Sequence, residues 1–278
     1  MIDLHTHSTV SDGSDPPAGV VRLAAAAGCR AVALTDHDRL DGLAEARAEA
    51  AHHGVELVPG CELSCAWSPG TLHLLVYFVE TGEGPLQEEL VRLQVDRHER
   101  NLALVRRLRE LGVPITAEEV EAEAGNGGVG RPHVAAVLVA KGVTNSIQEA
   151  FDGWLGKGAP AYIPKGRLEP SRAIHLARRS GGLPTLAHPL SLGLPPEQLR
   201  EAVAELADAG LVGLEAYYGR YEPDERAALI AMAEDLGLVA TGGSDHHGRY
   251  KPGLTVGSGA GDLEVPDSVL EALAARRA

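Results

Sequence analysis

The chain alternates short apolar runs with longer helical segments, and this alternation constrains the fold more than any other feature. The clearest apolar runs are 31–34, 55–59, 184–187, 211–214 and 238–241. Runs of this length are typical of buried strands, and glycine follows several of the helical segments because it readily adopts the left-handed backbone that ends a helix. A repeated strand–helix unit of this kind predicts a parallel sheet or barrel of the α/β class.

An imidazole or a carboxylate follows nearly every one of these predicted strands. The residues concerned are His5 and His7, His37, Glu62, His188, Glu215, and Asp245 with His247. Because the C-terminal ends of barrel strands meet on one face, we expect these side chains to converge there. Random placement would scatter them along strands and helices, so the pattern itself predicts a functional site.

The first group of these residues follows the apolar step at the start of the chain. His5 and His7 are two residues apart, and in an extended backbone both project to the same side. Asp12 follows in the turn-rich segment 11–14. Two imidazoles and a carboxylate make half of a transition-metal site, although on their own they are equally consistent with a polar N-terminus that carries chance histidines.

A hairpin is predicted over residues 63–79, with its turn at Ser68-Pro69-Gly70. Folding the second arm back would bring His73 close to Glu62. The alternative is that His73 is only a half-buried polar residue of a strand.

The donor types indicate which ions this site would hold. Nitrogen and oxygen donors without a thiolate cluster suit manganese, zinc or iron better than calcium. The candidates outnumber the ligands of one ion, so we expect two or three divalent ions, with Glu62 available as a bridge. Such ions lower the pKa of water and stabilise the entering and leaving oxygens of a phosphoryl displacement, which predicts attack on a phosphate ester by a metal-bridging hydroxide.

The helical periodicity changes after residue 85 and indicates an insertion. We predict a discontinuous barrel domain over 1–84 and 165–278, and a helical insertion over 85–164 that contributes to the substrate pocket. Arg131 and His133 stand at a predicted helix N-terminus, which attracts anions. Together with Lys165 they are expected to bind substrate phosphate, whereas the alternatives are a surface arginine and an ordinary loop lysine.

Charge and composition exclude several classes of protein. The net charge is −14, which argues against stable binding of long duplex nucleic acid. The arginines of the predicted helix 85–111 alternate with acids, which favours a solvated face over an RNA-binding patch. We expect no membrane span and no signal sequence, because no apolar run has the required length. Three cysteines suggest buried thiols and a cytoplasmic location.

Short motifs spread along the whole chain resemble those of the PHP (polymerase and histidinol phosphatase) family of metal-dependent phosphoesterases. The matching motifs are Asp3-Leu4-His5-Thr6-His7-Ser8, Ser11-Asp12-Gly13, Thr35-Asp36-His37-Asp38, Gly60-Cys61-Glu62, Ala187-His188-Pro189 and Gly243-Ser244-Asp245-His246-His247. The resemblance implies a distorted, TIM-like (β/α)7 barrel with a small helical insertion and a trinuclear site, often with manganese. It also implies three ligand sets, namely His5, His7, Glu62 and Asp245 for one ion, Glu62, His73 and His188 for a second, and Asp12, His37 and His247 for a third.

The segments 130–133 and 162–165 resemble a subgroup that includes 3′,5′-nucleoside bisphosphate phosphatases and 5′→3′ exoribonucleases. This implies a hydrolase that acts on a nucleotide with 3′ and 5′ phosphates or on the 5′ end of a short oligonucleotide. We expect the protein to be a monomer. The residues expected to carry the reaction are His5, His7, Glu62, His188 and Asp245. The alternatives are a histidinol-phosphate phosphatase, a non-catalytic metal- or nucleotide-binding module, and an RNA-binding protein that uses the arginine-rich helix.

Overall fold

A single curved sheet organises the molecule. The computed structural model describes residues 1–125, 128–164 and 168–277. Within these residues seven strands pair in sequence order. They are β1 (Ile2–Thr6), β2 (Ala31–Leu34), β3 (Glu56–Cys65), β4 (Leu72–Tyr77), β5 (Leu183–Leu186), β6 (Gly213–Tyr218) and β7 (Val239–Gly243). Neighbouring strands are parallel except that β4 runs antiparallel to both β3 and β5.

The two ends of the sheet meet and nearly close a barrel. The amide of Asp245, just after β7, donates to the carbonyl of His5 in β1 at 2.8 Å. Next to it, the amide of His7 donates to the carbonyl of His246 at 3.0 Å. Through these hydrogen bonds the first and last strands become neighbours, and the prediction of a distorted α/β barrel is confirmed.

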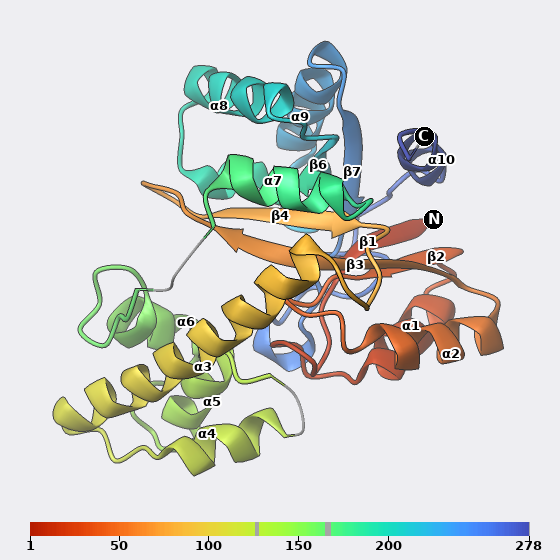
Figure 1. The fold of residues 1–278 in the computed structure, drawn as a ribbon. Helices are drawn as coiled ribbons and strands as arrows, with labels where there is room; N and C mark the ends of the chain where they lie inside the picture. The colour runs from red at the N-terminus through yellow and green to blue at the C-terminus, as the bar shows by residue number, and fades with distance from the viewer. Residues whose placement is uncertain (126–127, 165–167, 278) are drawn as a thin grey trace.

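Helices surround the barrel and lie above and below the strands in the view of Figure 1. They are α1 (Pro17–Ala26), α2 (Leu43–His53), α7 (Pro170–Arg179), α8 (Pro196–Asp208), α9 (Pro223–Asp235) and α10 (Ser268–Ala275). Four of them begin at a proline, whose fixed φ and missing amide hydrogen suit the first helical turn. The short 3-10 segments η2 (Pro189–Leu192) and η3 (Gly248–Tyr250) follow β5 and β7. Among the described helices, none combines the length and apolar character that a membrane span requires.

A second group of helices lies beside the barrel, at the lower left of Figure 1. It consists of α3 (Pro85–Glu110), α4 (Ala117–Ala124), α5 (Arg131–Ala140), α6 (Ile147–Ala150) and the π-helical turn η1 (Phe151–Leu155). These elements share their own apolar cluster, which includes Leu104, Leu108 and Leu138. They fall inside the range predicted as an insertion, and the domain boundaries stay a prediction.

Strand β3 differs from its prediction in one respect. The sequence suggested a strand over 55–59 and a separate hairpin arm from 63, but the structure has one continuous strand. Its first half pairs with β2 up to Pro59, and its second half pairs with β4 from Gly60 onward. Because the strand exchanges one partner for the other without a break, Glu62 lies inside a strand instead of at a strand end.

Candidate metal centre

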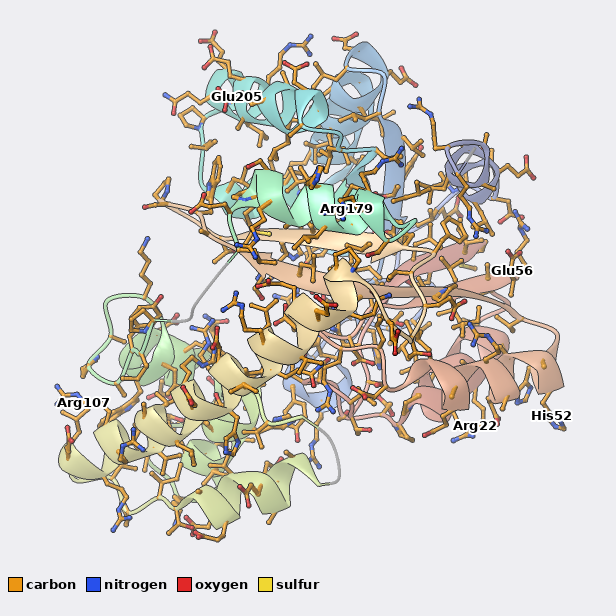
Figure 2. The ribbon with its side chains drawn as sticks, in the orientation of Figure 1. Arg22, His52, Glu56, Arg107, Arg179 and Glu205 are labelled. Carbon is orange, nitrogen blue, oxygen red and sulfur yellow. The ribbon has the colours of Figure 1, made fainter. Side chains whose placement is uncertain are left out.

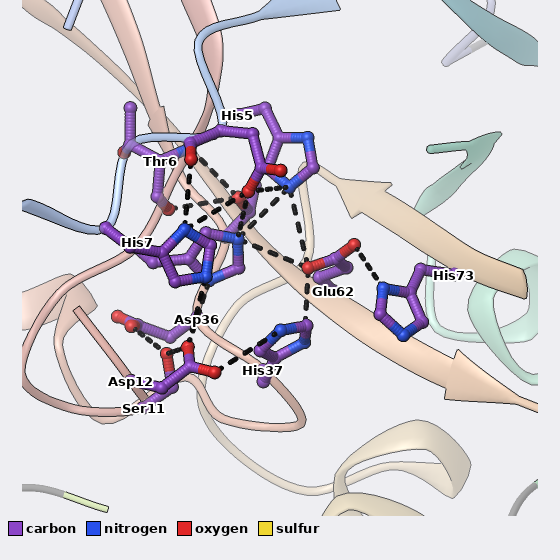
Figure 3. Close-up of polar contacts among 12 residues, drawn as sticks. His5, Thr6, His7, Ser11, Asp12, Asp36, His37, Glu62 and His73 are labelled. Atoms are coloured by element: carbon purple, nitrogen blue, oxygen red, sulfur yellow. Dashed lines mark hydrogen bonds and ion pairs between the residues drawn. The ribbon is translucent and has the colours of Figure 1, made fainter. Parts of the chain in front are cut away.

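Side chains from both ends of the sheet converge at the barrel mouth (Figure 3). Three groups of potential ligands each have one donor atom per residue within 4.8 Å of the others. The groups are His7, Asp12, His37 and His247; His5, His7 and Asp245; and His37, Glu62 and His73. These groups contain eight of the nine residues that the sequence predicted as ligands. The ninth, His188, lies beside them, with Nε2 at 3.1 Å from Glu62 Oε1.

Glu62 lies at the centre of this cluster and is 1% exposed. Its Oε2 is 3.2 Å from His7 Nε2 and 3.1 Å from His37 Nδ1. Its Oε1 is 2.9 Å from His73 Nδ1 and 3.1 Å from His188 Nε2. The two carboxylate oxygens thus face different imidazoles, which is the arrangement that a bridging ligand needs.

The hairpin explains how His73 reaches Glu62. Ser64 in β3 is directly opposite His73 in β4, and Glu62 is two residues before Ser64 on the same face of the sheet. Diagonal pairs across antiparallel strands are within reach of long side chains. The predicted proximity of His73 and Glu62 is therefore confirmed.

The cluster fits divalent metal ions on two independent observations. The ring nitrogens His7 Nδ1 and His37 Nδ1 are buried, and neither forms a hydrogen bond within the described residues, although carboxylate oxygens lie 3.8 Å and 3.1 Å away from them, respectively. The Nε2 atoms of His5 and His7 lie only 3.1 Å apart, so both imidazoles point at one spot. Buried nitrogens without partners are rare, and a coordinated cation satisfies them.

The carboxylates of the cluster are held in the charged state that metal ligands need. Burial alone would raise the pKa of Glu62, but His37, His73 and His5 outweigh burial and hold that pKa well below its usual range. Asp12 behaves in the same way, since His37 and His247 lower its pKa despite burial. Both groups are therefore anionic at neutral pH.

Glu215 holds two of the candidate ligands in place by hydrogen bonds, and this role was not predicted. This buried carboxylate accepts a hydrogen bond from His5 Nδ1 at 2.9 Å and from the backbone amide of His188 at 2.6 Å. The bond to Nδ1 leaves His5 Nε2 directed at the cluster. The sequence placed Glu215 after a strand, but no local signal separated a supporting carboxylate from a ligand.

Asp36 performs a similar task for the loop that carries Asp12. It accepts hydrogen bonds from the Ser8 amide at 2.8 Å, the Ser8 hydroxyl at 2.7 Å and the Ser11 hydroxyl at 2.6 Å. These bonds tie residues 8–11 to the end of β2, and Figure 3 shows Ser11 beside Asp36. Asp12 is thereby held opposite His37, at 3.7 Å between Oδ2 and Nε2.

Backbone strain accompanies two of the candidate ligands. His188 has φ 28° and Asp245 has φ 55°, values that are uncommon for residues other than glycine. Such conformations persist where the surroundings enforce them, and they concentrate at functional sites. The hydrogen bonds from the backbone amides, to Glu215 for His188 and to the His5 carbonyl for Asp245, supply that constraint.

The structure places two of the three predicted phosphate-binding residues. Arg131 lines a cavity of about 140 Å³ that borders Asp12, His37 and His73. His133 is 1% exposed, and its Nδ1 accepts a hydrogen bond from the Gly130 amide at 2.9 Å, so it supports the start of α5. Its contact with substrate stays a prediction. Lys165 lies outside the described residues.

The same cavity contains two arginines that sequence reasoning missed. Arg97 and Arg100 of α3 line it together with Arg131, and we call this space the arginine cavity. Arg97 also forms an ion pair with Asp38, 59 residues away in the sequence. The mixed charges of α3 gave no signal that these two arginines turn inward.

The remaining histidines lie apart from the cluster. His246 Nδ1 donates to the Leu254 carbonyl at 2.9 Å and Nε2 lies 3.0 Å from Asp15 Oδ2, so this histidine has a structural role. His52, His98 and His175 are exposed on helices. His52 projects outward from the end of α2, alongside the charged side chains that cover the surface (Figure 2).

Comparison with known proteins agrees with this geometry. The PHP domain matches residues 3–117. The chain is 32% identical to the 5′-3′ exoribonuclease Rnm of Escherichia coli, over 89% of this chain and 85% of the relative. It is 30% identical to the 3′,5′-nucleoside bisphosphate phosphatase of Chromobacterium violaceum, over 92% of this chain and 90% of the relative.

A solved structure supports the same assignment. A protein of Bifidobacterium adolescentis, described as a metal-dependent phosphoesterase, superimposes with a TM-score of 0.88 at 28% identity and covers 99% of this chain and 96% of its own. Sequence relatives, fold and clustered ligand types agree on one assignment. The chain belongs to the PHP domain family and is a metal-dependent phosphoesterase.

Proposed function

We propose that this enzyme hydrolyses the 3′ phosphate ester of nucleotides that carry a 5′ phosphate, either in a nucleoside 3′,5′-bisphosphate or at the 5′ end of a short oligonucleotide. The observation that carries the proposal is the position of the arginine cavity, which opens directly beside Asp12, His37 and His73. A site for anions thus adjoins a site for cations.

Nine candidate ligands would hold the metal ions between them. They are His5, His7, Asp12, His37, Glu62, His73, His188, Asp245 and His247. We expect two or three divalent ions, with manganese first and iron or zinc as alternatives. Bound there, such ions would neutralise charge on the phosphate and lower the pKa of a water molecule. Glu215 and Asp36 keep the ligand-bearing segments in place.

The arginine cavity is suited to a terminal phosphate. Arg97 and Arg100 are largely buried, and Arg97 Nε has no hydrogen-bond partner among the described residues. Planar guanidinium groups pair with phosphate oxygens in two-pronged fashion, and low solvent access strengthens these bonds. A 5′ phosphate in this cavity would orient the nucleotide so that its 3′ phosphate reaches the metal centre.

One bond-breaking step accounts for both kinds of substrate. A water oxygen forms a bond to phosphorus, the bond from phosphorus to the 3′ oxygen breaks, and that oxygen leaves with a proton derived from the water. A bisphosphate then yields inorganic phosphate and a 5′ nucleotide. An oligonucleotide yields the same 5′ nucleotide and a shortened chain that again begins with a 5′ phosphate.

The test compares adenosine 3′,5′-bisphosphate, adenosine 3′-monophosphate and histidinol phosphate after removal of bound metal and addition of Mn²⁺. We expect the bisphosphate to have the highest kcat/KM. The variant Arg131→Met keeps an unbranched side chain but removes the charge and the donors. It should raise KM for the bisphosphate far more than for the 3′-monophosphate, which lacks the 5′ phosphate. A preference for histidinol phosphate would overturn the substrate proposal and leave the phosphoesterase assignment standing.

A further inference from the structure

A second and larger cavity also borders the metal centre. Its volume is about 480 Å³, within the range of roughly 300–1,000 Å³ that is typical of ligand pockets. It is lined by Pro132, Ser146, Ile147, Gln148, Phe151, Arg220, His247, Tyr250, Lys251 and Pro252. We call this space the outer cavity.

The two cavities adjoin each other and the metal centre. Pro132 and Phe151 line both of them, so these two side chains form the wall between the cavities. The arginine cavity reaches the metal centre at Asp12, and the outer cavity reaches it at His247. The atoms His247 Nε2 and Asp12 Oδ1 are 3.4 Å apart. A phosphate at the metal centre could therefore extend into both cavities at once.

The lining of the outer cavity combines the two features that recognise single-stranded nucleic acid. Phe151 and the largely buried Tyr250 line the cavity with aromatic rings, and Arg220 and Lys251 line it with basic groups. Proteins that bind single strands stack bases on aromatic rings and attract the backbone with basic side chains. Lys251 is held in place because Nζ donates to Tyr218 Oη at 3.0 Å and pairs with Asp245.

The two cavities differ in volume and in the exposure of several lining residues, and these differences indicate their occupants. Ser146, Gln148, Arg220 and Pro252 at the outer cavity are all exposed, so a chain could leave the protein there. The arginine cavity is smaller, at about 140 Å³, and Arg100 on its wall is only 7% exposed. A small, arginine-rich space suits a terminal phosphate, and a large, open one suits a chain that continues.

We propose, on the basis of the proposed function above, that the outer cavity binds the nucleotide that follows the scissile phosphate of a 5′-phosphorylated oligonucleotide. Arg220 would contact the next backbone phosphate, and Phe151 and Tyr250 would contact the base. A nucleoside bisphosphate leaves this cavity empty of nucleotide. The outer cavity therefore determines how strongly the enzyme prefers oligonucleotides to bisphosphates.

The experiment measures kcat/KM with Mn²⁺ for three substrates that share the first nucleotide: adenosine 3′,5′-bisphosphate, pApA and pApApA. Only pApApA carries the backbone phosphate that Arg220 would contact. Replacement of one charged contact corresponds to about a tenfold change. For Arg220→Ala we therefore expect the ratio of pApApA to bisphosphate to fall about tenfold and the ratio of pApA to bisphosphate to fall much less.

Two further variants control for unrelated effects. Arg220→Lys keeps the charge and should restore most of the preference for pApApA. Arg200→Ala removes an exposed arginine of α8 that pairs with Asp235. Its kcat/KM values for the three substrates should match those of the unaltered enzyme.

Each outcome decides the matter. An equal loss of kcat/KM for all three substrates would show that Arg220 serves the shared first nucleotide. No loss of kcat/KM for any of them would show that Arg220 contacts no substrate. Both results overturn the inference while the proposed function stands. If the unaltered enzyme hydrolyses none of the three substrates, the proposed function fails and this inference fails with it.

Discussion

The Glu215 carboxylate accepts a hydrogen bond from His5 Nδ1 at 2.9 Å, with both side chains fully buried. A histidine that donates one ring nitrogen to a carboxylate presents the other to a metal in a fixed tautomer and orientation. Glu215 is not one of the predicted ligands, but its hydrogen bond determines the orientation of one of them, His5.

The variant Glu215→Gln tests this supporting role. The amide keeps the shape but loses the charge that aligns His5, and loss of such an outer partner typically weakens metal affinity or activity by about 10- to 100-fold. Metal titration followed by activity assay measures both effects. Glu205→Gln, on the exposed face of α8, should behave as the unaltered protein. Equal metal affinity in the two variants would contradict the role of Glu215.

Asp36 should contribute to stability as well as to the site. Asp36→Ala removes the acceptor of three hydrogen bonds from Ser8 and Ser11, and we expect the free energy of unfolding to fall by roughly 3 kcal/mol. Urea denaturation measures this. The exposed Asp41, which pairs with Arg39, offers a control: Asp41→Ala should change stability by less than about 1 kcal/mol.

Gly243 permits the close approach of β7 to β1. A Cβ atom at this position would lie 2.4 Å from the His5 amide nitrogen and 2.5 Å from the His5 Cβ. Gly243→Ala should therefore displace His5 and reduce activity, with a lower melting temperature. Gly153→Ala adds a Cβ that meets no atom within 4 Å, and it should leave the melting temperature unchanged or raise it. Similar behaviour of the two variants would contradict this account.

The metal-free protein should lose stability as pH rises. Burial lowers the pKa of His7, but hydrogen bonds to Asp245 and Glu62 outweigh burial and raise the pKa to about 9 from 6.5. Because the pKa of His7 is higher in the folded than in the unfolded state, protonation of His7 stabilises the fold. This contribution to the free energy of unfolding is complete below pH 6.5 and disappears as pH rises through 9. The loss attributable to His7 is roughly 3 kcal/mol.

Urea denaturation in EDTA at pH 6, 7.5 and 9 measures this dependence. His5 adds to it, because Glu215, Asp245 and Glu62 outweigh burial and raise its pKa as well. The variant His7→Asn should show a shallower decline. With metal present the trend should reverse, since metal binding requires neutral imidazoles and releases protons. A flat profile for the unaltered, metal-free protein would contradict the prediction.

Much of the fold and the ligand set could be predicted because both depend on local patterns. Apolar runs predict strands, and the barrel rule places strand ends together, so His5, His37, His188 and Asp245 could be named without coordinates. The hairpin turn gave the proximity of His73 to Glu62. The metal-binding roles themselves stay predictions until an occupied site is measured.

The rest could not be predicted because it depends on pairing between distant residues. The continuity of β3 results from an exchange of partners at Gly60, which composition does not reveal. The inward turn of Arg97 depends on Asp38, and the supporting roles of Glu215 and Asp36 depend on which neighbours they meet. A mixed-charge helix or a buried carboxylate has many possible partners in sequence, and only the folded chain selects one.

Pro132 and Phe151 belong to α5 and η1, whereas every predicted ligand comes from the strands of the sheet or from the loops that follow them. Substitution of these two residues can therefore change the shape of the substrate cavities while the predicted metal ligands stay the same. In a lineage built this way, new substrates can be acquired through changes in the neighbouring helices, long before any change reaches the barrel.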